Sequence, residues 1–178
     1  MNKALAFLAV ASMCAVVATG TGCETDEGGT GGTGGTIGPL TWTSGDLTII
    51  GDECEFFDPN EMLTFAITID GSTVTMEVTD PPGIGLQVST DNYDPADDAV
   101  LLTGIATNDE FPPCVVELAD AFELSLDDPD SSLDENVTVQ VTWSHSETDV
   151  SDTVGDCEGE WFVSLPCSGE AVFELTQE

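Results

Sequence analysis

Basic residues are almost absent from this chain of 178 residues, which has one Lys or Arg against 35 Asp or Glu and a single histidine. Nucleic-acid binding depends on cations that neutralise phosphate. Phosphorylated cofactors are held by arginine forks or P-loop lysines. The composition therefore excludes nucleic acid as a partner and disfavours anionic lipid surfaces and phosphorylated cofactors.

The acidic surplus also bears on stability and on partners. Carboxylates without Lys or Arg partners repel one another until salt or bound cations screen them. We interpret the acidity first as a means of staying soluble in a saline habitat. The partners that such a surface attracts are cationic ones.

The chain has little that suggests catalysis. His145 is its only imidazole, and no G-x-S-x-G nucleophile elbow is present. His145 continues the alternation of Val141 and Trp143, so we expect it on the inner face of a strand, near the end of that strand. Ser144 and Ser146 then point to the opposite face, and the sequence predicts a protein that is not an enzyme.

Paired carboxylates are the one catalytic pattern left open. Glu158 and Glu160 share a face of a predicted strand, as the two acids of a glycosidase do. Chance pairs are common among 35 acidic residues. A carboxylate-based hydrolase therefore remains only as an alternative.

The N-terminus has the three parts of a secretory signal peptide. Lys3 gives a basic start, residues 4–18 are almost wholly apolar, and small residues follow at 19–22. The apolar run is shorter than the roughly 20 residues that a membrane-spanning helix needs. We expect residues 1–22 to be removed, which leaves a mature chain with no Lys or Arg.

The end of this segment resembles a known processing signal. Gly20-Thr21-Gly22-Cys23 resembles the lipobox of bacterial lipoproteins, although Gly20 stands where that family usually has a large apolar residue. The resemblance covers residues 1–23. It implies that Cys23 becomes the first mature residue, carries lipid such as palmitate, and anchors the protein to the outer membrane, at its periplasmic face or at the cell surface. Ordinary signal cleavage is the alternative.

The cysteine count agrees with export. Of six cysteines, Cys14 leaves with the signal and Cys23 takes the lipid, and the remaining four are Cys54, Cys114, Cys157 and Cys167. An even number in an exported chain predicts two disulfides. Three pairings are open, and we favour Cys54–Cys114 with Cys157–Cys167 because the second closes a short loop. Zinc is disfavoured, since the chain has no C-x-x-C and one histidine.

Two segments follow the signal. Residues 23–39 contain the Gly/Thr repeat GGTGGTGGTIG, which has no side chains to bury and is expected to be a disordered tether. About eleven such residues reach roughly 18 Å. Residues 40–178 then form one domain.

That domain alternates apolar and polar residues at period two almost throughout. Asp70-Gly71 between two alternating runs is a hairpin signal. We predict an all-β fold, a single antiparallel domain of about nine short strands, with a barrel of lipocalin-like meander favoured over a sandwich. The strands are expected at 40–50, 63–69, 74–78, 84–88, 99–106, 122–126, 137–144, 161–165 and 171–175. Residues 114–121 also fit helical spacing, so a short helix is expected there.

Acidic loops and tryptophans are the remaining candidate sites. Ca²⁺ takes six to eight oxygen ligands, and two runs are rich in such donors, although neither has EF-hand spacing: Asp91, Asp94, Asp97 and Asp98 in one, and Asp128, Asp130 and Asp134 in the other. The alternative for both is a solvated acidic loop. Tryptophans in such a domain are first of all core anchors. An eight-stranded barrel also has room for one small ligand, and the candidate pocket residues are Trp42, Trp143, Trp161 and His145.

Together these features predict an envelope-anchored acidic lipoprotein that serves as a structural, interaction or binding module. It would touch the membrane only through its lipid, act as a monomer and need no cofactor other than a candidate Ca²⁺. One alternative is a β-barrel that binds a small neutral or apolar ligand. A second is a Ca²⁺-dependent adhesion module.

Overall fold

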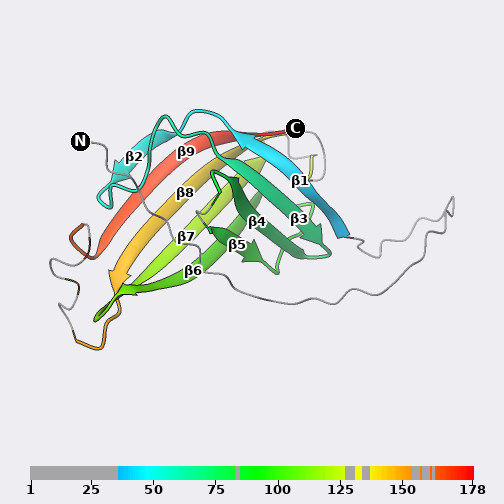
Figure 1. Cartoon of the computed structure of the whole chain (residues 1–178). Helices are drawn as coiled ribbons and strands as arrows, with labels where there is room; N and C mark the ends of the chain where they lie inside the picture. Colours follow the sequence, from blue (N-terminus) through cyan, green and yellow to red (C-terminus); the bar gives the residue numbers. More distant parts are fainter. Residues whose placement is uncertain are drawn as a thin grey trace, which may run out of the picture.

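The structure is a computed structural model that describes residues 36–82, 85–126, 131–133, 137–153, 157, 161 and 163–178. These residues form nine strands and no helix, which confirms the all-β prediction (Figure 1). No helical segment of the described chain is therefore long and apolar enough to cross a bilayer. The strands are β1 Thr36–Ser44, β2 Thr48–Asp52, β3 Thr64–Asp70, β4 Thr73–Asp80, β5 Gln87–Thr90, β6 Ala99–Phe111, β7 Cys114–Leu126, β8 Thr138–Asp149 and β9 Cys167–Gln177.

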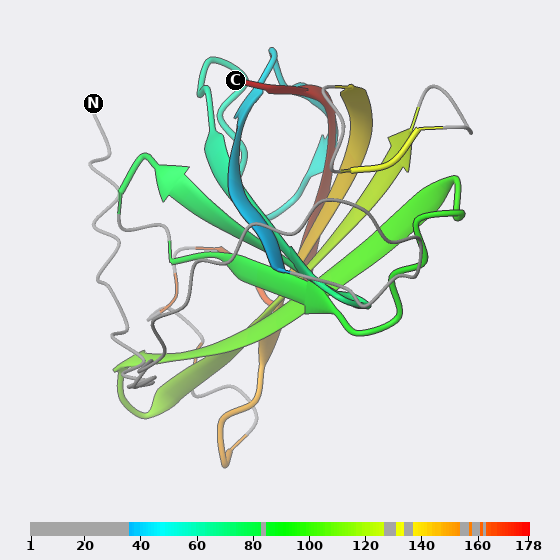
Figure 2. The same cartoon turned by 90° about the vertical axis from the view of Figure 1, so that its right-hand side faces the viewer.

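The strands close into an eight-stranded barrel with one extra strand. From β3 to β9 each strand pairs antiparallel with the next, and β1 closes the ring by pairing with both β3 and β9. Figure 2 shows β1 and β9 coming together near the C-terminus. The predicted meander barrel is therefore confirmed over the sandwich.

The extra strand β2 continues the path of β1. Residues 42–44 of β1 pair with the end of β9, and residues 48–52 of β2 pair further along the same strand. The short segment 45–47 separates them. The single strand expected at 40–50 thus exists as two pieces, and β1 begins at Thr36, four residues before the expected domain boundary.

Two local expectations were wrong. Residues 114–121 lie in β7 rather than in a helix, because β7 pairs with β6 and β8 along nearly its whole length. A short apolar run fits both the helical and the strand period, and pairing with a neighbouring strand on each side favours the strand. The described residues of 161–165 are irregular chain rather than a strand.

The interior of the barrel is filled by large side chains. Phe65 lies 6.1 Å from Phe122 and 6.0 Å from Phe173 between ring centroids, and Phe122 stacks on Trp143 at 4.8 Å. Trp42 is fully buried in the same core. Each such side chain contributes roughly 1.5–3 kcal/mol by leaving water. The tryptophans Trp42 and Trp143 are therefore core anchors.

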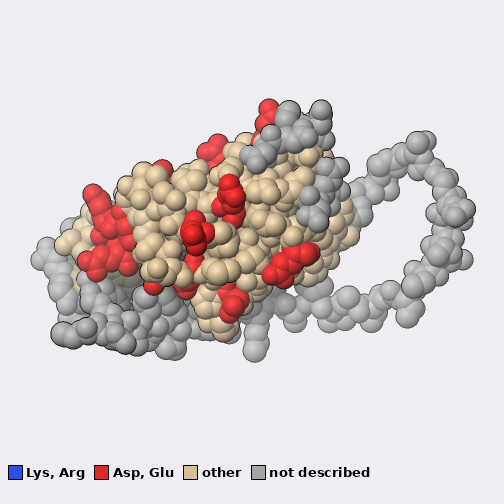
Figure 3. Space-filling view, turned by 90° about the horizontal axis from the view of Figure 1, so that it is seen from above, with Lys and Arg blue, Asp and Glu red and all other residues tan. Residues whose placement is uncertain are grey.

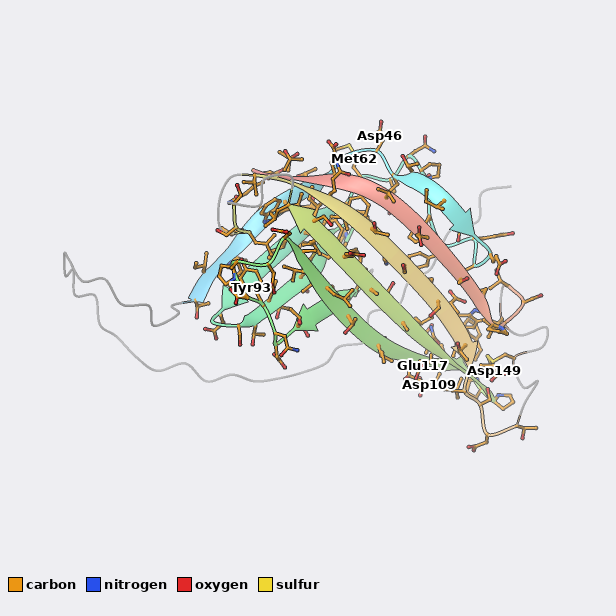
Figure 4. The ribbon with its side chains drawn as sticks, turned by 180° about the vertical axis from the view of Figure 1, so that it is seen from behind. Asp46, Met62, Tyr93, Asp109, Glu117 and Asp149 are labelled. Atoms are coloured by element: carbon orange, nitrogen blue, oxygen red, sulfur yellow. A yellow bond between two sulfur atoms is a disulfide. The ribbon has the colours of Figure 1, made fainter. Side chains whose placement is uncertain are left out.

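A second, smaller cluster lies beyond the barrel core. It consists of Cys114, Val116 and Cys157, with Phe111, Leu118, Trp161 and Leu165 packed against them. It forms because β6, β7 and β8 are 13, 13 and 12 residues long, whereas β3, β4 and β5 have 7, 8 and 4. The long strands project past the short ones and carry Asp109, Glu117 and Asp149 at their far end (Figure 4).

The four cysteines predicted to form disulfides do so, but in a pairing that we did not favour. Cys54 bonds to Cys167, and Cys114 bonds to Cys157. The register explains the first bond, because Asp52 pairs with Gly169 and this brings the residues just beyond them together. The favoured pairing was wrong because closeness in sequence does not outweigh strand register.

Candidate functional site

The inner face of β7 and β8 changes from apolar to polar where the barrel core ends. Asp120, His145 and Glu147 are 9%, 3% and 7% exposed and lie between the two apolar clusters. Asp120 pairs directly with His145 across the strands, and Glu147 is two residues further along β8, hence on the same face. We call these three residues the polar layer.

The histidine of the polar layer contacts both carboxylates. Its Nδ1 lies 2.9 Å from Asp120 Oδ1 and its Nε2 lies 3.3 Å from Glu147 Oε1. The indole N–H of Trp143 donates to Asp120 at 2.8 Å, and that of Trp161 donates to Glu147 at 2.5 Å. A buried polar network is stabilising when its members are satisfied, as they are here.

The chain after β2 closes over the polar layer. The ring of Phe56 stacks on the imidazole of His145, with centroids 3.8 Å apart and planes at 14°. The carboxylate of Asp52 accepts hydrogen bonds from the backbone N–H groups of Phe56 and Phe57 at 2.9 and 3.0 Å. The bond from Cys54 to β9 fixes the same segment, so the layer is covered from this side.

Burial and charge act on His145 in opposite directions. Desolvation lowers its pKa, but hydrogen bonds to Asp120 and Glu147 and their negative charges outweigh that effect and raise the pKa from 6.5 to about 9. His145 is therefore an imidazolium at neutral pH, and both ring nitrogens donate. The polar layer holds one cation between two carboxylates.

The raised pKa makes stability depend on pH. Because the pKa of His145 is higher in the folded state, its contribution is complete below pH 6.5 and is lost as the pH rises to about 9. We expect a loss of about 3 kcal/mol across that window. NMR titration gives a direct test, since the chain has one histidine. An imidazole that titrates near 6.5 in the folded protein would contradict this assignment.

The polar layer has the character of a structural element. Ser144 and Ser146 lie on the opposite face of β8 from His145, as the alternation predicted, so neither hydroxyl faces the imidazole. His145 is nearly inaccessible to solvent and uses both ring nitrogens. Glu158 and Glu160 lie outside the described residues. The expectation that the protein is not an enzyme stays a prediction.

Among the described residues, one group of potential metal ligands lies at the polar layer. Atoms of Cys54, His145 and Glu147 come within 4.8 Å of one another. Cys54 is bonded to Cys167 and offers no thiolate, and both ring nitrogens of His145 are already in contact with carboxylates. The donor set does not suit a metal ion.

The candidate Ca²⁺ ligands stand apart from this site. Asp91, Asp94, Asp97 and Asp98 are exposed between β5 and β6, and no three of their carboxylates converge among the described residues. The carboxylate of Asp91 accepts from Thr73, and that of Asp94 accepts from the backbone of Ala96. Asp128, Asp130 and Asp134 lie outside the described residues. Ca²⁺ binding stays a prediction.

An open groove of about 720 Å³ lies on the outer face of the long strands. The side chains that line it and point outward come from β2, β6, β7, β8 and β9, and include Ile50, Ile105, Ala121, Ser144 and Glu170. Asp120 and His145 point inward, so they contribute only backbone to its floor. Of the four candidate pocket residues, His145 alone borders the groove. Trp161 packs against the second cluster.

Comparisons with protein-family models, curated proteins and solved structures find no match to this chain. The function is therefore inferred from its own geometry and chemistry. Two features stand out, namely the covered polar layer inside and the open groove outside.

Proposed function

We propose that this protein is a lipid-anchored binding module of the bacterial envelope. The signal-like residues 1–22 and the lipobox-like end at Cys23 support export and lipidation. The two disulfides are compatible with export, because such bonds persist in oxidising compartments. The Gly/Thr repeat that follows Cys23 is suited to hold the barrel away from the membrane surface.

One observation carries the binding role: the barrel interior is filled, whereas the outer face is hollowed. Phe65, Phe122 and Phe173 occupy the space in which a lipocalin-like barrel would hold a ligand. The groove on β6–β9 and β2 is instead open to solvent. We therefore place the binding surface on the outside of the barrel.

The anchoring half of the proposal is tested by fractionating cells. We expect the wild-type protein in the membrane fraction with a fatty-acylated N-terminal peptide detectable by mass spectrometry. We expect Cys23→Ser to be soluble or retained with its signal, because no thiol remains to acylate. Cys14→Ser is the matched control, since that residue lies in the signal core and should leave lipidation intact. A wild-type N-terminal peptide that carries no fatty-acyl group would refute the anchor.

The alternative, a small ligand held inside the barrel, is tested on the purified mature protein by native mass spectrometry. We expect the mass of the polypeptide without a small molecule retained inside the barrel, because large aromatic side chains occupy its core. A stoichiometric apolar ligand that survives transfer would instead favour the barrel as a carrier of small molecules.

A further inference from the structure

We infer that the outer groove binds an extended, cationic segment of a partner protein in which Lys or Arg alternates with aliphatic residues. The inference rests on the proposed binding role and adds the chemistry of the partner. It depends on three properties of the groove: its shape, its apolar flanks and its uncompensated charge.

The shape follows from short side chains in the middle of the sheet. The pairing aligns Ala119, Ser146 and Ser168 in one row across three strands. The adjacent row contains Ala121 and Ser144. These small residues leave a depression at the centre of the outer face, and the longer side chains that line the groove lie around it.

The dimensions suit an extended chain. The groove crosses five adjacent strands, β6, β7, β8, β9 and β2. At about 4.8 Å between strands, the crossing is roughly 19 Å long, which matches a segment of about six extended residues. A peptide in that conformation presents alternate side chains to the floor and to solvent, and its two ends meet the flanks of the groove at β6 and β2.

The flanks are aliphatic side chains that stay exposed. Ile50 is 63% exposed on the β2 side, and Ile105 is 72% exposed on the β6 side. Both border the groove. Single exposed aliphatic residues are ordinary on a surface, but two that bracket one depression provide apolar contact for a partner.

The charge of the groove selects the partner. Glu53 and Glu170 border it and are exposed, and Glu123 is exposed on the same outer face of β7. The described residues contain no Lys or Arg, and the face in Figure 3 shows acidic side chains with no basic ones. A segment with Lys or Arg gains attraction here, whereas an anionic one is repelled.

The same charge argues against the other occupants. A second copy of this chain would bring its own carboxylates against Glu53 and Glu170, so repulsion opposes self-association. A neutral segment would fill the depression but leave both carboxylates unpaired. A cationic and partly aliphatic segment satisfies the flanks and the charge together.

The test uses the purified mature protein and a fluorescein-labelled decapeptide in which lysine and valine alternate, followed by fluorescence anisotropy. We expect Ser144→Tyr to weaken binding by about 10-fold or more, because it fills the floor without changing the charge. Thr41→Tyr is the matched control, since Thr41 is exposed on β1 outside the groove, and it should bind as wild type does.

A second pair of variants tests the charge. Glu53→Gln with Glu170→Gln should weaken binding several-fold and reduce its salt dependence. The control removes as much charge elsewhere, through Asp46→Asn with Glu77→Gln; both residues are exposed and neither lines the groove. Equal losses of affinity in both double variants would mean that only the net charge of the protein matters, which would overturn the assignment of the binding site to the groove.

The remaining outcomes separate this inference from the broader proposal. Undiminished binding to Ser144→Tyr, or no binding to wild type, overturns the inference. Neither outcome bears on the lipid anchor, which the fractionation experiment tests separately. If a peptide of alternating serine and valine binds as tightly and is blocked by Ser144→Tyr, the groove is a binding site but its partner is not cationic.

Discussion

Replacing His145 by leucine is expected to destabilise the protein by about 3–5 kcal/mol, the loss that follows when one partner of a buried ion pair is removed. Asp120 and Glu147 are nearly buried and would face each other without the imidazolium between them. The substitution also removes the ring on which Phe56 stacks. Urea unfolding at neutral pH measures the loss.

Neutralising the carboxylates provides the control for that experiment. His145→Leu combined with Asp120→Asn and Glu147→Gln removes the unpaired charges, and the amide oxygens can still accept from Trp143 and Trp161. We expect the triple variant to be more stable than His145→Leu alone. A triple variant less stable than the single one, or a single variant within about 1 kcal/mol of wild type, would show that the layer is not held by charge pairing.

Removing the Cys54–Cys167 bond is expected to cost about 4–5 kcal/mol on the chain-entropy account. The two residues are 113 apart in sequence, so the bond closes most of the barrel into one loop and strongly restricts the unfolded chain. The same bond fixes the segment that carries Phe56 over His145. Unfolding of Cys54→Ala with Cys167→Ala under non-reducing conditions measures the loss.

The other disulfide offers a matched comparison. Cys114 and Cys157 are 43 residues apart, so their removal is expected to cost slightly less, about 4 kcal/mol. Each double variant should leave the remaining bond intact, which peptide mapping checks. If Cys54→Ala with Cys114→Ala instead leaves an intact Cys157–Cys167 bond in a protein as stable as the other variants, the connectivity described here is wrong.

The architecture was predictable because it depends on local patterns. Alternation at period two identifies most of the strands, and the turn at Asp70-Gly71 fixes one hairpin from neighbouring residues alone. The alternation of Val141 and Trp143 also placed His145 correctly on the inner face of β8, although the strand continues to Asp149 and does not end near His145 as expected. Such signals do not require knowledge of the partner strand.

The polar layer was only partly predictable. His145 was recognised, but Asp120 was not, because residues 114–121 were interpreted as a helix. In a strand, Asp120 shares the inner face with Val116 and Phe122, and an acid at that position is the signal that was missed. Phe56 reaches the layer from a loop, for which no periodicity gives a direction.

The disulfides and the groove depend on long-range register. Cys54 meets Cys167 because β2 pairs with β9 at a particular offset, which the sequence does not state. The groove likewise exists because small residues of β7, β8 and β9 fall side by side. Each strand on its own shows only an ordinary solvent-facing pattern.

The central claim is that the protein binds a cationic segment through the outside of its barrel, and amide NMR mapping of the isotopically labelled mature protein tests it most directly. On titration with the decapeptide of alternating lysine and valine, we predict that shift changes concentrate at residues 103–105, 119–121, 144–146 and 168–170, which border the groove. Changes confined to the acidic loop at 91–98, spread evenly over the surface, or absent altogether would contradict the claim.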